Sequence, residues 1–587
     1  MQPITRTLTL ICAAALLVGP GPHKSAFAQQ ARPFAISGEY DRPAKMRHQS
    51  RSMVIASHGM VATSQPLAAQ VGLDILRAGG TAADAAIATC AMMGLVEPMD
   101  AGIGGDLFAI YWDHKTQKLY GLNASGRSPY ALNRDVFRSR GMAEIPEEGV
   151  LSWSVSGCVD GWDQLRRRFG TMSFKQLLAP TIQYAEEGFP VTEVIAGLWA
   201  NEQQGAMKYA DTKATFFPNG RPPAIGEIFR NPHLAASLRA ISQGGRDAFY
   251  RGSIAEQIVA ASKTLGGFFS MKDFEDHQSE WVEPVSTNYR GHDVWELPPN
   301  GQGIAALEIL NILGGYDVHA MGRNSPDYWH LFIEAKKLAY ADRAKYIGDP
   351  AYHKLPVAEL ISKDYAARQR KRIDMRHAAT SVDPGDPLLA KKGDTIYLCV
   401  VDKDRNCCSL IQSNYWGFGS YVVPGNTGFV VQNRGSQFSL DPKHVNSLEP
   451  HKRPFHTIIP AMVTKDGKPW LCFGVMGGDF QPQGHTQILV NMIDFGLDVQ
   501  AAGDAGRIRH DGSQTSTGQP MTPPGGTLDI ESGIPDATIA ELLRRGHQID
   551  RKGGDTFGGY EGIWIDQQHG TLHGATEPRK DGAAVGY

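Results

Sequence analysis

The sequence predicts an α+β fold in which helices cover β-sheets, and two features of the chain indicate this. Residues 54 to 380 contain one clear hairpin pattern among long segments with a 3.6-residue apolar period. From Thr395 onward short apolar runs typical of strands dominate, with one late helix expected over 536–546. A four-layer αββα sandwich fits this order, although periodicity alone leaves other layered arrangements open.

Two successive helices are predicted over residues 65–80 and 81–98. Both segments have apolar residues at helical spacing; Gly79-Gly80 would end the first, Thr81 would cap the second and Pro98 follows it. Other segments with a helical period are expected to make the middle of the chain mainly helical. These segments are 174–189, 232–250, 325–347 and a loop running into a helix over 296–313.

A hairpin is predicted from the strands 107–112 and 118–123 around the turn 113–117. The preceding "GIGG" resembles half of a phosphate-binding loop. No Lys-Ser/Thr pair follows it, and a strand rather than a helix comes next, so we expect no phosphate site there.

The first 28 residues read as a secretory signal. Arg6 precedes an apolar run from Leu8 to Val18, and Ala26-Phe27-Ala28 forms an A-x-A cleavage site. The apolar run is too short to span a bilayer, and the sequence offers no other candidate span. We therefore expect an exported, soluble protein, periplasmic in a bacterium with two membranes.

Composition narrows the possible partners and cofactors. The net charge is −3 with 20% charged residues, and no long basic run occurs, which argues against nucleic acid and anionic membranes as partners. No C-x-x-C pair and no zinc-like His/Cys spacing is present, so no disulfide framework, metal or other cofactor is expected. Beyond Cys12 of the signal, the cysteines are Cys90, Cys158, Cys399, Cys407, Cys408 and Cys472.

The stretch "KKGDTIYLCVVDKDRNCCSLIQSN" (391–414) predicts a second hairpin. A three-residue loop, 403–405, pairs Asp402 with Asn406 and places Thr395 opposite Ser413 on one face. A five-residue loop keeps this pairing, whereas two- or four-residue loops change it. Because opposed Cβ atoms lie about 4.5–5.5 Å apart, a second hydroxyl would adjoin Thr395.

A threonine at this position has a bland and a chemical interpretation. Threonine is common in strands, and Gly-Asp is ordinary turn chemistry. Alternatively, Thr395 becomes an N-terminus whose α-amine, with a reference pKa of about 7.7–8.0, serves as base for its own hydroxyl. Its Oγ would attack the carbonyl of Asp394, and water would release the upstream chain from the ester. The polar stretch 376–394 is expected to be exposed and flexible enough to move away.

Several motifs resemble the gamma-glutamyltranspeptidase family, in that family's order and over nearly all of the mature chain. They are "SHGMVATSQPLAAQVGLDILRAGGTAADAAIATCAMMGLVEP", "GIGGDLFA", "GDTIYLCVVDKDRN", "VVQNRGSQFS", "RPFHTIIPAMV", "GVMGGD" and "GATEPRKDGAAVGY". The resemblance implies the αββα fold of N-terminal-nucleophile hydrolases. It also implies self-cleavage of the chain that remains after removal of the signal peptide 1–28, into a large subunit 29–394 and a small subunit 395–587, which together form one catalytic unit. The implied reaction moves a γ-glutamyl group from glutathione or a related amide to water or an amino acid.

The resemblance also assigns roles to residues of this sequence. Thr395 matches the nucleophile, and cleavage falls between Asp394 and Thr395; Ser413 takes the place of a threonine that hydrogen-bonds the nucleophile. Gly477 and Gly478 match the glycines whose N–H groups form an oxyanion hole. A tight turn after the strand 470–475 is the alternative explanation for this glycine pair.

The acyl-binding residues depart from the pattern of the best-known members. The family's arginine falls at Ser125, with Arg127 two residues later. An aspartate that receives the α-amine is matched by the neutral Gln437, and an asparagine is matched by Tyr415. A Ser-Ser pair is matched by His456-Thr457. The resulting substrate-binding candidates are Arg127, Asn433, Arg434, Gln437, His456 and Thr457.

These departures leave the substrate open. Arg127 and Arg434 could each bind a carboxylate bidentately or serve in a structural ion pair. Loss of the aspartate favours an outlying, acylase-like branch that accepts glutaryl groups as well as γ-glutamyl groups. The 14 residues between Phe438 and Arg453 contain no Tyr, Phe or Trp, which predicts an open site with room for bulky leaving groups.

Three functions therefore compete. The first is a self-processing γ-glutamyl hydrolase or transpeptidase, and the second is a glutaryl or cephalosporin-type acylase of the same fold. The third is an unprocessed periplasmic binding protein without catalysis.

Overall fold

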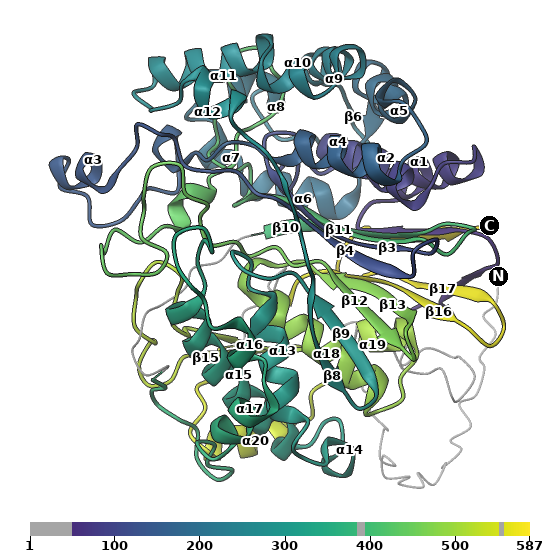
Figure 1. Cartoon of the computed structure of the whole chain (residues 1–587), viewed down its shortest axis with the longest axis vertical. Coiled ribbons are helices and arrows are strands. Elements are labelled where there is room, and N and C mark those ends of the chain that lie inside the picture. The colour runs from purple at the N-terminus through teal and green to yellow at the C-terminus, as the bar shows by residue number, and fades with distance from the viewer. Residues whose placement is uncertain (1–49, 384–393, 551–556) are drawn as a thin grey trace, which may run out of the picture. The chain divides into compact units, whose positions relative to one another are not determined.

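The computed structural model describes residues 50–383, 394–550 and 557–587, and within them the strands form two seven-stranded antiparallel sheets (Figure 1). Sheet 1 has the order β1 (Val54–Ala56), β17 (Thr571–Ala575), β16 (Tyr560–Asp566), β13 (Lys468–Val475), β12 (Ala461–Lys465), β9 (His292–Glu296) and β8 (Val285–Tyr289). Sheet 2 has the order β18 (Ala583–Gly586), β2 (Met60–Thr63), β10 (Asp394–Val401), β11 (Cys407–Tyr415), β3 (Asp106–Asp113), β4 (Lys118–Ala124) and β7 (Glu280–Val282).

Two groups of helices cover the outer faces of these sheets (Figure 1). On the side of sheet 2, α1 (Pro66–Arg77), α2 (Ala82–Val96) and α4 (Cys158–Phe169) contact the sheet, and α5 (Phe174–Glu187), α9 (Pro232–Gly244) and α11 (Ser253–Thr264) pack on other helices. On the side of sheet 1, α13 (Gly303–Leu313), α18 (Gln481–Ile493) and α19 (Val499–Asp504) contact the sheet, α15 (Pro326–Tyr346) packs on α13, and α20 (Asp536–Arg544) packs on α15.

Strand alternation explains how one sheet serves two cores. On β3, Leu107 and Ala109 face the core shared with α2 and α4, while Phe108 and Ile110 face the core between the sheets. Successive side chains of a strand point to opposite faces, so a strand buried on both sides reads as a continuous apolar run. On β13, Gly474 lies so close to the Tyr397 ring that a Cβ there would stand 2.5 Å from it. Glycine thus allows the two sheets to approach.

The helices and the first hairpin predicted from the sequence are confirmed. Thr81 caps α2 and forms a capping box with Asp84, and Gly79 has a φ of 92° just after α1. The strands β3 and β4 pair as expected around a turn in which Gln117 has a φ of 53°.

The middle of the chain is mainly helical, as expected, although β7, β8 and β9 lie among its helices. The expectation of one late helix was wrong, because the C-terminal part contains α18 and α19 besides the expected α20. α18 is buried almost all round, so it lacks the polar face that reveals an amphipathic helix, and Pro482 and Gly484 disguise it further. The strands in the middle were hidden because they lie between strongly helical segments.

The register of the second hairpin follows the prediction over most of its length. Val401 pairs with Cys407 and Ile396 with Gln412, around a loop in which Arg405 has a φ of 64°. The register then shifts, so that Asp394 pairs with Tyr415. The irregularity therefore falls at Thr395, the nucleophile predicted from the sequence.

Sheet 2 mixes strands from both sides of the expected cleavage position. β10 and β11 lie between β2 and β3, and β18 closes the far edge beside β2. Sheet 1 likewise places β8 and β9 beside β12, and β1 beside β17. The two parts of the chain are thus hydrogen-bonded to each other within both sheets.

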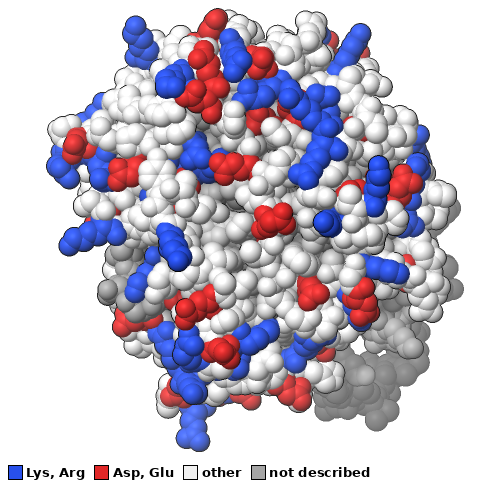
Figure 2. Space-filling model, in the orientation of Figure 1, with Lys and Arg blue, Asp and Glu red and all other residues white. Residues whose placement is uncertain are grey.

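The distribution of surface charge and the hydropathy of the helices concern two expectations from the sequence, the absence of a nucleic-acid partner and the absence of a membrane span. Acidic and basic side chains are interspersed over the face shown in Figure 2. Among the described residues, no helix combines the length and the apolar character needed to cross a bilayer. The six described cysteines are buried and free.

Candidate active site

The site is built around the end of the buried strand β11, where Ser413 and Tyr415 are among the last three residues. Tyr415 has a φ of 84°, which is rare for a bulky residue and costs of the order of 1–3 kcal/mol. Its N–H donates to Ser413 Oγ at 2.8 Å. Thr395 is the second residue of β10, but its side chain and that of Asp394 lie outside the described part of the structure. The nucleophile, the cleavage site and the Thr395–Ser413 contact therefore stay predictions.

Arg434 joins two predicted site residues that are far apart in the sequence. It begins the short 3₁₀ turn η3 (Arg434–Gln437), and its Nη2 donates to Ser413 Oγ at 3.0 Å. Its Nη1 donates to Thr457 Oγ1 at 2.7 Å. The structure thus gathers Ser413, Arg434 and Thr457 around one guanidinium.

This guanidinium is fully buried and incompletely paired. Within the described residues it donates to the two hydroxyls above, and its Nε is buried without a partner. The ring of Tyr415 lies 4.3 Å from the guanidinium carbon, a cation–π contact. Burial lowers the pKa of Arg434 to about 10, so it stays charged at neutral pH. A buried cation of this kind can bind an anion, and among the described residues only two of its five N–H donors have partners.

His456 is held by the acid that follows the "GIGG" turn. Its Nε2 donates to Asp106 Oδ2 at 3.0 Å, and both side chains are inaccessible to solvent. Burial, and then the nearby charge of Arg434, lowers the pKa of His456 to about 4, so the ring is neutral near pH 7. Its Nδ1 is buried without a hydrogen-bond partner among the described residues.

Asn433 directly precedes the 3₁₀ turn η3 and Gln437 is its last residue; both side chains are buried. Gln437 donates to the hydroxyl of Tyr415 and accepts from Ser516 Oγ at 3.0 Å. Asn433 accepts from the N–H of Trp416 at 3.2 Å and donates to the carbonyl of Glu147 at 2.8 Å. Gln437 therefore adjoins the Tyr415 side of the site, whereas Asn433 fixes backbone around it.

Gly477 and Gly478 form a turn directly after β13. Their φ values are 116° and 56°, and a Cβ on Gly477 would stand 2.9 Å from Gly558 Cα, so glycine is required there. Gly477 precedes the 3₁₀ turn η4 (Gly478–Phe480) and Gly478 begins it, and this turn leads into α18. N–H groups at such a helical start lack intrahelical acceptors and favour negative charge. The arrangement is suited to an oxyanion hole.

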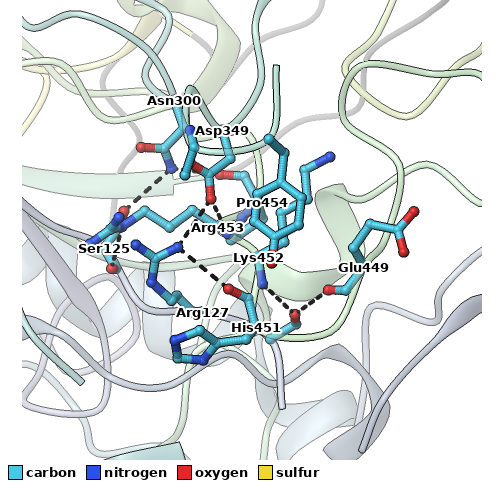
Figure 3. Close-up of polar contacts among 12 residues, drawn as sticks. Ser125, Arg127, Asn300, Asp349, Glu449, His451, Lys452, Arg453 and Pro454 are labelled. Atoms are coloured by element: carbon cyan, nitrogen blue, oxygen red, sulfur yellow. Dashed lines mark hydrogen bonds and ion pairs between the residues drawn. The ribbon is translucent and has the colours of Figure 1, made fainter. Parts of the chain in front are cut away.

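Arg127 lies in an ion-pair cluster instead (Figure 3). Its Nη1 donates to Asp349 at 3.2 Å and its Nη2 to Glu280 at 3.0 Å. Arg453 shares Glu280 at 2.8 Å, and the N–H of Arg453 donates to Asp349 at 2.8 Å. Arg127 thus binds carboxylates of the protein itself, which agrees with the interpretation of Arg127 as part of a structural ion pair.

The loop between Phe438 and Arg453 is packed down. Lys452 donates to the carbonyls of Val445 and Ser447, and Asn446 donates to that of Gln437. The loop forms part of the wall of a cavity of about 380 Å³ beside Gln437, and the open site expected from the sequence stays a prediction. Its lining includes Met142, Glu144, Gln437, Phe438, Leu440 and Gln519.

One group among the described residues has the composition of a metal site. His330, Glu334 and His547 bring their ligand atoms within 4.8 Å of one another. The two imidazoles are hydrogen-bonded to each other at 2.8 Å, and Glu334 is paired with Lys337 at 2.8 Å. Because these groups satisfy one another and an ammonium is in contact, we assign no metal to them.

Sequence reasoning missed Asp106 and gave no role of its own to Tyr415. Asp106 also accepts from the N–H groups of Gly126 and Gly157, both at 3.0 Å. An acid placed at the start of a buried strand, directly after the "GIGG" turn, was the available signal for it.

Replacing Ser413 with alanine is expected to slow catalysis about tenfold and leave the protein folded. The change removes the hydroxyl that accepts from Arg434 and, by prediction, orients Thr395. Steady-state kinetics alongside thermal unfolding would measure both effects. Unchanged turnover would mean that Ser413 has no such role.

The chain belongs to the gamma-glutamyltranspeptidase family, whose model matches residues 68–587. More particularly, it belongs to an outlying branch of that family that lies near acylases.

Three relatives define this branch. The chain is 38% identical to the glutathione hydrolase-like YwrD proenzyme of Bacillus subtilis over 91% of its own length and 99% of that protein. It is 32% identical to the acylase ACY 1 proenzyme of Pseudomonas sp. (strain SE83), over 90% of this chain and 93% of that protein. The crystal structure of a cephalosporin acylase from Bacillus halodurans superposes with a TM-score of 0.85 at 43% identity, over 93% and 98% of the two chains. The fold and these relatives identify the protein as a mixed α+β hydrolase of the gamma-glutamyltranspeptidase family.

Proposed function

We propose that the protein is a self-processing amidohydrolase that removes acyl groups ending in a carboxylate, γ-glutamyl or glutaryl, from amides. Thr395 would carry the acyl group and pass it to water or to an amino acid. The single observation that carries this proposal is the buried guanidinium of Arg434, which contacts Ser413 and Thr457.

The charge of the site supports a carboxylate as the recognised group. Arg434 is cationic and His456 neutral, and the nearest acids are engaged: Asp106 with His456, and Asp479 with Arg343 at 2.9 Å. Gln437 offers an amide in place of the family's aspartate. An ammonium would find no dedicated carboxylate among these described residues, so a glutaryl group would bind without losing an ion pair.

The reaction would proceed in two halves. The α-amine of Thr395 takes the proton of its own hydroxyl while Oγ attacks the amide carbonyl, and the N–H groups of Gly477 and Gly478 stabilise the oxyanion. The protonated α-amine would give its proton to the amine half of the substrate, which would leave, and the acyl group would remain as an ester on Thr395. Water or an amino acid would then attack this ester, with the α-amine of Thr395 again as base, and would release the acyl group.

The surroundings of the site support a range of leaving groups. The cavity beside Gln437 has a volume of about 380 Å³, within the range of small-molecule sites. We place the amine half of the substrate there. Its walls come from both proposed subunits, residues 134–147 and residues 436–441 and 517–519.

The remaining assignments follow from the same proposal. The precursor would lose a signal peptide, 1–28, and be cut into subunits 29–394 and 395–587 in the periplasm. The three cores, one between the sheets and one on each outer face, support the four-layer αββα arrangement of N-terminal-nucleophile hydrolases. Three of the curated relatives are named as glutathione hydrolase-like, acylase and glutathione hydrolase proenzymes, which supports processing.

Replacing Gln437 with aspartate tests what the acyl pocket recognises. We expect the wild type to show a modest preference between γ-glutamyl and glutaryl anilides. Gln437→Asp should shift kcat/KM about tenfold toward γ-glutamyl, since a new carboxylate would pair with the α-amine and about 1.4 kcal/mol is tenfold in rate.

The measurement is kcat/KM for both anilides with wild type and variant. Gln437→Glu is the matched control, because it adds the same charge on the wild-type side-chain length. A wild type that rejects glutaryl, with neither variant changing the ratio, would show that another group holds the amine. A wild type that hydrolyses neither anilide would refute the proposed function.

A further inference from the structure

Gln302 lies in the loop between β9 and α13, and its side chain contacts both sides of the proposed site. Its Nε2 donates to the carbonyl of Thr457 at 2.7 Å and to the carbonyl of Gly478 at 3.0 Å. Gln302 is completely buried. One side chain from the expected large subunit therefore joins two stretches of the expected small subunit, at Thr457 and Gly478, that lie just beyond the Ala461–Phe473 end of the pairing of β12 with β13.

The orientation of this amide is fixed by its third partner. Gln302 Oε1 accepts from Arg343 Nη1 at 2.5 Å, and an arginine can only donate. The same nitrogen donates to Asp479 Oδ1 at 2.9 Å, and Tyr340 donates to the Asp479 carbonyl. The NH₂ group of Gln302 must therefore face the two carbonyls.

Each carbonyl belongs to a segment whose position matters for the reaction. Thr457 holds Nη1 of Arg434 through its hydroxyl, so a shift of Thr457 moves the acyl-binding cation. Gly478 follows Gly477 in a turn whose glycine backbone has no side chain of its own to fix it. A buried hydrogen bond to the Gly478 carbonyl restricts rotation at that residue.

We propose that Gln302 is a positioning residue that sets the distance between the acyl-carboxylate site at Arg434 and the oxyanion hole at Gly477 and Gly478. The inference rests on the proposed function and deepens it. It predicts that the two hydrogen bonds donated by Gln302 Nε2 affect kcat more than KM, since the oxyanion forms only in the transition state.

Gln302→Glu and Gln302→Met test the inference, because both keep the size of the side chain and remove its NH₂ group. We expect kcat for the glutaryl anilide to fall ten- to a hundredfold with KM changed less than twofold. Hydrogen exchange should become faster in peptides covering 455–459 and 474–480 and remain unchanged elsewhere in the sheets. The exchange arm needs no substrate.

Gln487→Glu is the matched control. Gln487 is also buried, lies on α18 and exchanges two hydrogen bonds with the backbone of Ile508, at 2.8 and 3.3 Å. It should lower the melting temperature comparably, with kcat near that of wild type and faster exchange near 508. An equal loss of kcat in Gln487→Glu would show a general stability effect and overturn the inference.

The two proposals fail differently. If wild type hydrolyses neither anilide, the proposed function fails, and the exchange experiment still decides whether Gln302 fixes both segments. If exchange in 455–459 and 474–480 stays at the wild-type rate in both Gln302 variants, the positioning role is wrong.

Discussion

Replacing Thr395 with alanine is expected to give one uncut chain without amidase activity. The variant lacks the hydroxyl that would attack the carbonyl of Asp394 and later the substrate, so both reactions should stop together. Wild type should run on a denaturing gel as two chains, 29–394 and 395–587. Mass spectrometry of the intact protein would place the cut, and anilide release would measure the activity.

Thr395→Ser is the matched control, since serine keeps both the hydroxyl and the future α-amine. It should be cut and should hydrolyse the anilide, more slowly than wild type. A Thr395→Ala protein that is still cut between 394 and 395 in the absence of protease would disprove self-cleavage. An uncut wild type would support the binding-protein alternative.

Replacing Arg434 with methionine should lower kcat/KM for a glutaryl anilide by a hundredfold or more. Removing one partner of a buried charge pair costs about 3–5 kcal/mol, and about 1.4 kcal/mol is tenfold in rate. The same variant also loses the hydrogen bonds to Ser413 and Thr457, which slows any substrate. The ratio of glutaryl to butyryl anilide removes that shared loss, since butyryl lacks the carboxylate.

We expect this ratio to collapse in Arg434→Met and to stay near the wild-type value in Arg127→Met. Arg127 is paired with Asp349 and Glu280, so its loss should lower stability more than specificity. The opposite outcome, with the ratio sensitive to Arg127 alone, would move the carboxylate site to the cluster of Figure 3.

Local structure could be read from the sequence where local rules decide it. Thr81 as a helix cap and the pairing of Val401 with Cys407 follow from capping and hairpin geometry over a few residues. The register shift at the start of β10 could not be read from the sequence, because it depends on where Tyr415 lies. A site that contains both Ser413 and the pair Gly477-Gly478 was expected from the family resemblance alone and stays a prediction.

The partners of charged side chains were beyond sequence reasoning. From the sequence, Arg127 and Arg434 could each bind a substrate carboxylate or form a structural ion pair. The two arginines are distinguished by contacts that the sequence does not show, such as the ion pair of Arg127 with Glu280, more than 150 positions away. Gln302 gave no signal, since a glutamine in a Pro-Gly loop is typical of a surface turn. Its proposed role rests on its burial and on its hydrogen bonds to the carbonyls of Thr457 and Gly478, which are more than 150 positions away in the sequence.

The mixing of strands in both sheets has a consequence for the processed protein. Once the bond before Thr395 is cut, β10 and β11 remain between β2 and β3, so the two polypeptides separate only if the sheets unravel. Heating would then release two chains that must find each other again, and recovery on cooling would depend on concentration. The lifetime of the cut enzyme would be set by its rate of unfolding rather than by an equilibrium, whereas the uncut precursor could refold as a single molecule.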